Sequence, residues 1–86
     1  MDDSPIRSFA QERNLTYRWR TRTEGERAFA EIEVRQGKET LYTVANNCLS
    51  SEQHVLDNVM AWAIEDISQG VKHYIISGRE HAMPKG

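Results

Sequence analysis

Residues 15–35 alternate between apolar and charged side chains along most of their length. Successive side chains of a β-strand point to opposite faces of a sheet, so this period of two residues predicts a two-stranded hairpin. Gly25 lies between the two alternating runs and suits a turn that needs a positive φ. The charged face of the predicted hairpin contains Arg18, Arg20, Arg22, Phe29, Glu31, Glu33 and Arg35.

The parity of strand pairing limits the register of this hairpin. Opposing residue numbers that sum to 49 or 51 place Arg18 opposite Glu31 or Glu33. The same sums place Trp19 on the face that carries Ile32. An even sum would set arginines against Ile32 and bury their charge, so a slip of one residue is strongly disfavoured. The predicted sheet therefore has one apolar face and one face on which glutamates offset much of the arginine charge.

Helices are expected on either side of the strands. Ser4–Pro5 predicts the start of a short helix with Ser4 as its cap, and Asn14 is its expected end. Ser50–Gln53 matches a capping box and predicts a second helix, which Gly70 terminates. The apolar stripe of this second helix consists of Leu56, Val59, Met60, Ala63, Ile64 and Ile67, extended by Val55 and Trp62.

A third strand is expected over Glu39–Ala45. Simple alternation places Tyr42 and Val44 on the arginine face of the sheet and Leu41 on the other face. A β-bulge would invert this assignment.

The sequence thus predicts one α+β domain over residues 1–78, in the order α-β-β-β-α, followed by a loose tail over residues 79–86. A three-stranded antiparallel sheet packed on helices suits a chain of 86 residues. Val71–Ile76 is apolar and partly β-branched. This segment fits a fourth strand, and equally an extended arm that docks on another chain.

Catalytic and metal-binding patterns are absent from the sequence. His54, His73 and His81 are too scattered to form a local metal site. Cys48 is the only cysteine, which excludes an intrachain disulfide and two-cysteine metal motifs. The glycines are isolated, so no phosphate-cradling loop is expected. We therefore expect no cofactor and no enzymatic activity.

The amino terminus, Met1–Pro5, is acidic and lacks the features of a signal peptide. No apolar run approaches the roughly 20 residues that span a bilayer. The expectation is a cytoplasmic protein without a membrane partner.

The arginine face is the candidate binding surface. Its aromatic and arginine side chains suit a protein interface, in which these residue types often anchor binding. They also suit stacking on unpaired bases, or a merely solvated face whose ion pairs contribute under about 1 kcal/mol each. Because the net charge is −2, bulk charge does not favour nucleic acid. We expect a small protein-interaction module, a regulator, adaptor or inhibitor that binds another protein or a second copy, with RNA binding as the alternative. The candidate binding residues are Arg18, Arg20, Arg22, Phe29, Tyr42, Val44 and Tyr74.

The order of predicted elements over Ser4–Gln69 resembles the double-stranded-RNA-binding domain. The segments that carry the resemblance are Pro5–Glu12, Tyr17–Trp19, Ala30–Val34 and Ala61–Ile64. In that family, RNA contacts come from the first helix, the loop after the first strand and a lysine cluster that opens the second helix.

Two of these three contact regions differ here, although Gln11 and Glu12 in the first helix are compatible with minor-groove contact. The strand loop reads Gly25–Arg27 in place of a Pro-His signature, and Ser50–His54 contains no lysine or arginine. Phosphate attraction dominates affinity for nucleic acids. The resemblance therefore implies a member that keeps the scaffold for protein contacts. Such members commonly pair through the third strand and the second helix.

Overall fold

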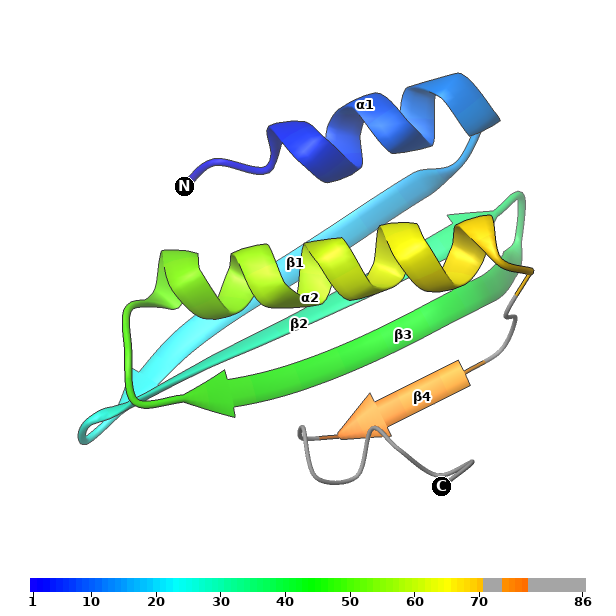
Figure 1. Cartoon of the computed structure of the whole chain (residues 1–86). Coiled ribbons are helices and arrows are strands. Elements are labelled where there is room, and N and C mark those ends of the chain that lie inside the picture. Colours follow the sequence, from blue (N-terminus) through cyan, green and yellow to red (C-terminus); the bar gives the residue numbers. More distant parts are fainter. Residues whose placement is uncertain (71–73, 78–86) are drawn as a thin grey trace.

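A computed structural model describes residues 1–70 and 74–77 of the chain. The elements are α1 (Ser4–Arg13), β1 (Thr16–Glu24), β2 (Arg27–Gln36), β3 (Glu39–Cys48), α2 (Glu52–Ser68) and β4 (Tyr74–Ser77). The strands form one sheet in the order β1-β2-β3-β4, and both helices lie on the same face of it (Figure 1). The predicted α+β class and the order helix, three antiparallel strands, helix are confirmed.

The hairpin of β1 and β2 has the predicted parity. Arg18 lies opposite Glu33 and Arg20 lies opposite Glu31, which corresponds to a residue-number sum of 51. Gly25 forms the turn with a φ of 60°. The apolar residues of both strands consequently share the face that the helices cover, which we call the inner face.

A β-bulge in β3 changes the outcome for the third strand. Thr40 and Tyr42 pair with consecutive residues of β2, so Leu41 between them is an extra residue. Beyond the bulge, each side chain of β3 faces opposite to the direction predicted by simple alternation. Tyr42 and Val44 therefore lie on the inner face, where both are 0% exposed. Their predicted place on the arginine face is wrong.

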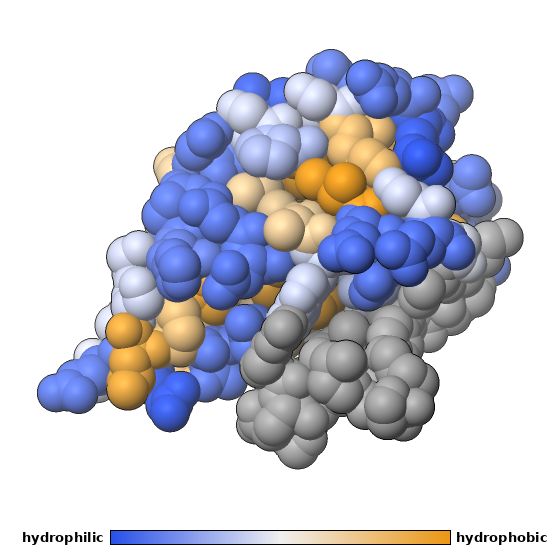
Figure 2. Space-filling view, viewed as in Figure 1, coloured by the Kyte–Doolittle hydropathy of each residue, from blue (hydrophilic) through white to orange (hydrophobic). Residues whose placement is uncertain are grey.

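The hydrophobic core fills the space between the inner face and the two helices. The apolar stripe of α2 supplies its largest share, and α1 adds Ile6, Phe9 and Ala10. On the helix side, apolar atoms reach the surface between α1 and α2 (Figure 2). A smaller apolar area lies at the connection from β3 to α2, where Leu49 is 66% exposed. The buried residues of α2 are Val55, Leu56, Val59, Met60, Ala63 and Ile67.

Short-range chemistry accounts for the helix ends. The backbone N–H of His54 donates to Oγ of Ser51 at 3.0 Å, so Ser51 caps α2. The predicted cap, Ser50, is one residue too early. Asn14 closes α1 in the left-handed region with a φ of 61°, and Gly70 follows α2 with a φ of 90°, as both were predicted to do.

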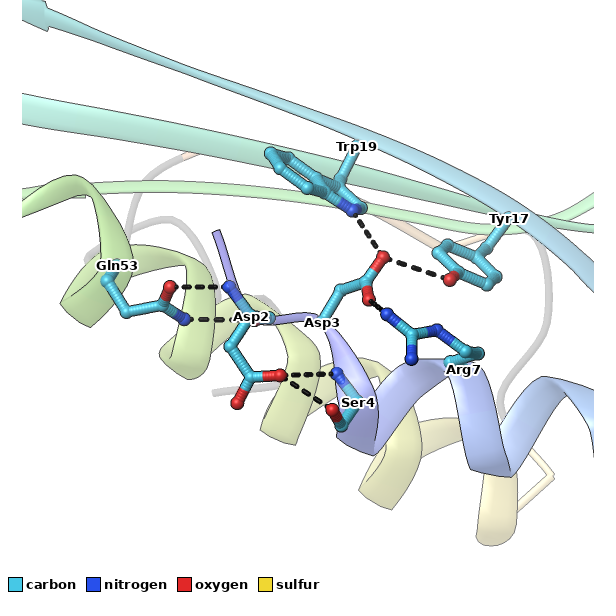
Figure 3. A network of polar contacts seen from close by, with 7 residues as sticks. All are labelled: Asp2, Asp3, Ser4, Arg7, Tyr17, Trp19 and Gln53. Atoms are coloured by element: carbon cyan, nitrogen blue, oxygen red, sulfur yellow. Dashed lines mark hydrogen bonds and ion pairs between the residues drawn. The ribbon is translucent and has the colours of Figure 1, made fainter.

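The start of α1 is held by Asp3, which occupies the cap position predicted for Ser4. Its carboxylate accepts hydrogen bonds at 3.0 Å from both the Trp19 indole and the Tyr17 hydroxyl, and it pairs with Arg7 (Figure 3). These contacts lower the pKa of Asp3, the Trp19 indole N–H being the largest cause. The network fastens the first helix to β1.

A second contact in the same region joins the amino terminus to α2. The backbone N–H of Asp2 donates to Oε1 of Gln53 at 2.8 Å, and Nε2 of Gln53 donates to the carbonyl of Asp2 at 3.0 Å (Figure 3). The Asp2 carboxylate also accepts from the backbone and hydroxyl of Ser4. These bonds hold the first residues of the chain between the two helices.

The predicted segment Val71–Ile76 contains most of the fourth strand. β4 pairs with residues 42–45 of β3 and runs parallel to them, whereas the predicted sheet was antiparallel throughout. The direction follows from connectivity, because α2 carries the chain back along the sheet before β4 begins. Residues 71–73 and the predicted tail, 79–86, lie outside the described residues.

Candidate interaction face of the sheet

The face of the sheet opposite the helices, which we call the outer face, is built from alternate residues of β1, β2 and β3. No helix of the described residues covers it, because α1 and α2 both pack on the inner face (Figure 1). It carries most of the predicted arginine surface. The outer-face residues in the paired strands are Thr16, Arg18, Arg20, Arg22, Glu24, Arg27, Phe29, Glu31, Glu33, Arg35, Thr40, Thr43, Ala45 and Asn47.

Two arginines of the outer face pair with glutamates of the neighbouring strand. Nε of Arg18 lies 2.7 Å from Oε1 of Glu33, and Nε of Arg20 lies 3.0 Å from Oε1 of Glu31. The hydrogen bond from Arg18, followed by one from the Thr40 hydroxyl, lowers the pKa of Glu33. Cross-strand neutralisation is therefore present, as the sequence predicted.

Arg22 has a different environment. Its guanidinium carbon lies 4.2 Å from the centre of the Phe29 ring, and its Nε donates to Glu24 of the same strand at 2.9 Å. The arginine covers the aromatic face in a cation–π contact. The Phe29 ring is half-buried, and the guanidinium group of Arg22 lies over it, next to the two ion pairs.

An open depression of about 420 Å³ lies between the strands on this face. Arg20 and Arg22 frame it on β1, Phe29 and Glu31 on β2, and Ala45 with Asn47 on β3. The short side chain of Ala45 leaves the space beside Glu31 unfilled, since Ala45 pairs directly with that residue. A smaller hollow of about 240 Å³ lies farther along β1, between Arg18, Arg20 and the two glutamates.

The structure brings together four of the seven predicted binding residues, namely Arg18, Arg20, Arg22 and Phe29. Tyr42 and Val44 are removed from the candidate site because they belong to the core. The hydroxyl of Tyr42 donates to Oδ2 of Asp66 on α2, which is the polar contact expected of a buried tyrosine. Tyr74 opens β4, and its side chain lies outside what the structure describes.

Sequence reasoning missed the contribution of β3 to the outer face. Ala45 and Asn47 take the positions that Tyr42 and Val44 had been assigned, and Asn47 accepts a hydrogen bond from Arg27 at 2.6 Å. The available signal was the polarity of Thr43. In the run from Tyr42 to Ala45, the tyrosine and the valine are buried more readily than the threonine between them.

Within residues 1–70 and 74–77, no group of three or more His, Cys, Asp or Glu side chains could hold a metal ion. None of the helices in this part of the chain is both long and apolar enough to cross a membrane. Cys48 is half-buried at the end of β3. No family model, curated protein or solved structure matches the chain.

Proposed function

We propose that this chain is a non-enzymatic protein-interaction module that binds its partner through the outer face of the sheet. The observation that carries the proposal is the depression framed by Arg20, Arg22 and Phe29, on a sheet face that no helix of the described residues covers. Arginine and aromatic side chains are enriched among the residues that dominate binding energy, and they act best in pockets that exclude water. The module acts as a regulator, adaptor or inhibitor, and its partner is another protein or a second copy of the chain.

The side chains of this face are suited to anchoring rather than to packing within the fold. The side chain of Arg20 is 81% exposed and that of Arg22 is 59% exposed. Exposed surface ion pairs contribute under about 1 kcal/mol each. A partner can therefore reorganise these pairs at little expense to the stability of the domain.

RNA binding through the same face is the alternative proposal, and the contact between Arg22 and Phe29 favours it. A ring capped by a guanidinium group resembles the stacking platforms on which unpaired bases bind. Against this, Glu31 and Glu33 offset the arginines.

Light scattering at low and high salt, with and without a short RNA duplex, separates these proposals. The comparison uses Arg20→Glu on the outer face and Arg13→Glu on α1, two exposed positions with the same change in charge. We expect either a salt-insensitive dimer or a protein captured from lysate, in each case lost in Arg20→Glu and kept in Arg13→Glu.

The proposed interaction module would be contradicted if the chain stays monomeric and captures no protein whose binding is lost in Arg20→Glu. A complex that forms only with RNA and only at low salt would replace it with the alternative, because released counterions make phosphate binding strongly salt-dependent.

A further inference from the structure

The described strands of the sheet end at β1 on one side and at β4 on the other. β3 is bordered by β4, so the third strand, through which the resemblance implied pairing, already has a strand on that side. β1 lies at the opposite end of the sheet order, and β2 is its only strand partner among the described residues (Figure 1). No backbone hydrogen bond described outside the regular elements involves a residue of Thr16–Glu24.

An edge strand exposes a row of backbone N–H and C=O groups that can pair with another chain. β1 is nine residues long, which is ample for an added strand. Extended peptides commonly bind in this way, with main-chain hydrogen bonds providing affinity and alternate side chains providing specificity.

The internal neighbour of β1 indicates which side chains fit beside it. On β2, Glu33 lies opposite Arg18 and Glu31 lies opposite Arg20. Both pairs close at 3.0 Å or less. A strand on the other side of β1 would meet the same row of guanidinium groups and needs the same alternation of carboxylates.

The arginines can accept a second partner. The side chains of Arg18, Arg20 and Arg22 are 76%, 81% and 59% exposed. Arg18 and Arg22 contact glutamates through Nε, and Arg20 contacts Glu31 through Nε and Nη2. A guanidinium group has five N–H donors, so several in each side chain remain for a carboxylate on the open side.

A second copy of the chain does not fit this edge. Pairing β1 with β1 of another molecule in antiparallel fashion would bring two rows of arginines together. Like charges directly opposite each other on neighbouring strands are destabilising. The occupant must therefore have the opposite charge.

We propose that the open edge of β1 binds an extended acidic segment of a different protein by strand addition, with carboxylates at alternate positions facing Arg18, Arg20 and Arg22. This inference rests on the proposed function, since it names the chemistry of the partner at the border of the outer face. The partner strand continues the ladder of ion pairs that β2 begins.

The test uses the full chain and a capped peptide of about nine residues, the length of β1, in which glutamate alternates with threonine. We expect saturable binding by calorimetry and slower amide exchange at alternate residues of β1. Replacing the glutamates by glutamine should weaken affinity about tenfold, because three exposed ion pairs are lost. Arg20→Glu should weaken binding of the glutamate peptide and improve binding of its lysine counterpart.

Two N-methylated versions of the peptide test strand addition itself. One carries methyl groups on odd amides and the other on even amides. Because only alternate N–H groups of an added strand face its neighbour, one version should lose binding and the other should keep it.

Equal binding of both versions would overturn strand addition. Absence of binding by the parent peptide would overturn the acidic partner. In either case the proposed function is judged separately, by whether Arg20→Glu abolishes association in the light-scattering and capture comparison.

Discussion

Replacing Tyr42 by alanine tests the assignment of the two sheet faces. Tyr42 is 0% exposed and is among the largest fully buried side chains of the domain. Truncating a buried aromatic residue removes its transfer free energy and leaves a cavity, at about 3–5 kcal/mol. At roughly 0.05–0.15 kcal/mol per residue, the whole domain has an unfolding free energy of about 4–13 kcal/mol. Tyr42→Ala should therefore remove a large fraction of the stability, or unfold the chain.

Tyr42→Phe separates the hydroxyl from the ring. The ring keeps its packing, while the hydrogen bond to Asp66 is lost. We expect the unfolding free energy to decrease by about 1.5 kcal/mol, which is the lower end of the range for hydrogen bonds to charged groups. The lower end applies because Asp66 is half-buried and water can replace the hydroxyl. A double-mutant cycle with Asp66→Ala should show that the two changes are coupled.

Urea denaturation monitored by tryptophan fluorescence measures these differences in unfolding free energy. In thermal unfolding, Tm should decrease by about 4–8 °C for each kcal/mol lost. Thr43→Ala is the matched control, since Thr43 is the next residue on the same strand and faces outward. Its unfolding free energy should stay within about 0.5 kcal/mol of the parent. If Tyr42→Ala kept the stability of the parent while Thr43→Ala lost several kcal/mol, the inner placement of Tyr42 would be refuted.

Three other substitutions test separate contacts. Asn46 is 6% exposed and its Oδ1 has no hydrogen-bond partner among the described residues, so Asn46→Val should raise the unfolding free energy by about 1–3 kcal/mol in denaturant titrations. Ser51→Ala should lower it by about 1 kcal/mol through loss of the α2 cap, whereas Ser50→Ala should leave it unchanged. The Trp19 hydrogen bond keeps the pKa of Asp3 below its ordinary value, so its ionised form adds stability that is present above the ordinary pKa of an aspartate and is lost as the pH falls through the lowered pKa. In a plot of the unfolding midpoint against pH, Asp3→Asn should therefore reduce the fall in the midpoint at acidic pH.

Each of these expectations has a clear opposing result. A destabilised Asn46→Val would mean that the buried amide has a partner in solution, such as an ordered water. Equal losses in Ser50→Ala and Ser51→Ala would place the cap elsewhere. An unchanged fall in the midpoint at acidic pH in Asp3→Asn would assign the acid sensitivity to other carboxylates, of which Glu33 and Glu52 also have lowered pKa values.

Local periodicity was sufficient to predict the helices and strands and the register of the hairpin formed by β1 and β2. Each strand of that hairpin repeats every second residue, and burying an arginine is unfavourable enough to select the register in which Arg18 faces Glu33. The stripe of α2 and the residues that end both helices, Asn14 and Gly70, likewise follow from interactions within a few residues. The arginine part of the candidate site was therefore predictable.

The membership of β3 in the two faces depended on long-range pairing. A single extra residue, Leu41, inverts every later position of the strand, and no local preference marks it as a bulge. The inverted strand moves Tyr42 into the core and brings Ala45 to the outer face, which opens the depression. The parallel direction of β4 and the hydrogen bonds of Asp3 to β1 also depend on long-range contacts. Both join residues far apart in the chain. Sequence periodicity shows which residues of an element share a face, but it does not show which elements pack against each other. Only the tertiary structure decides such contacts.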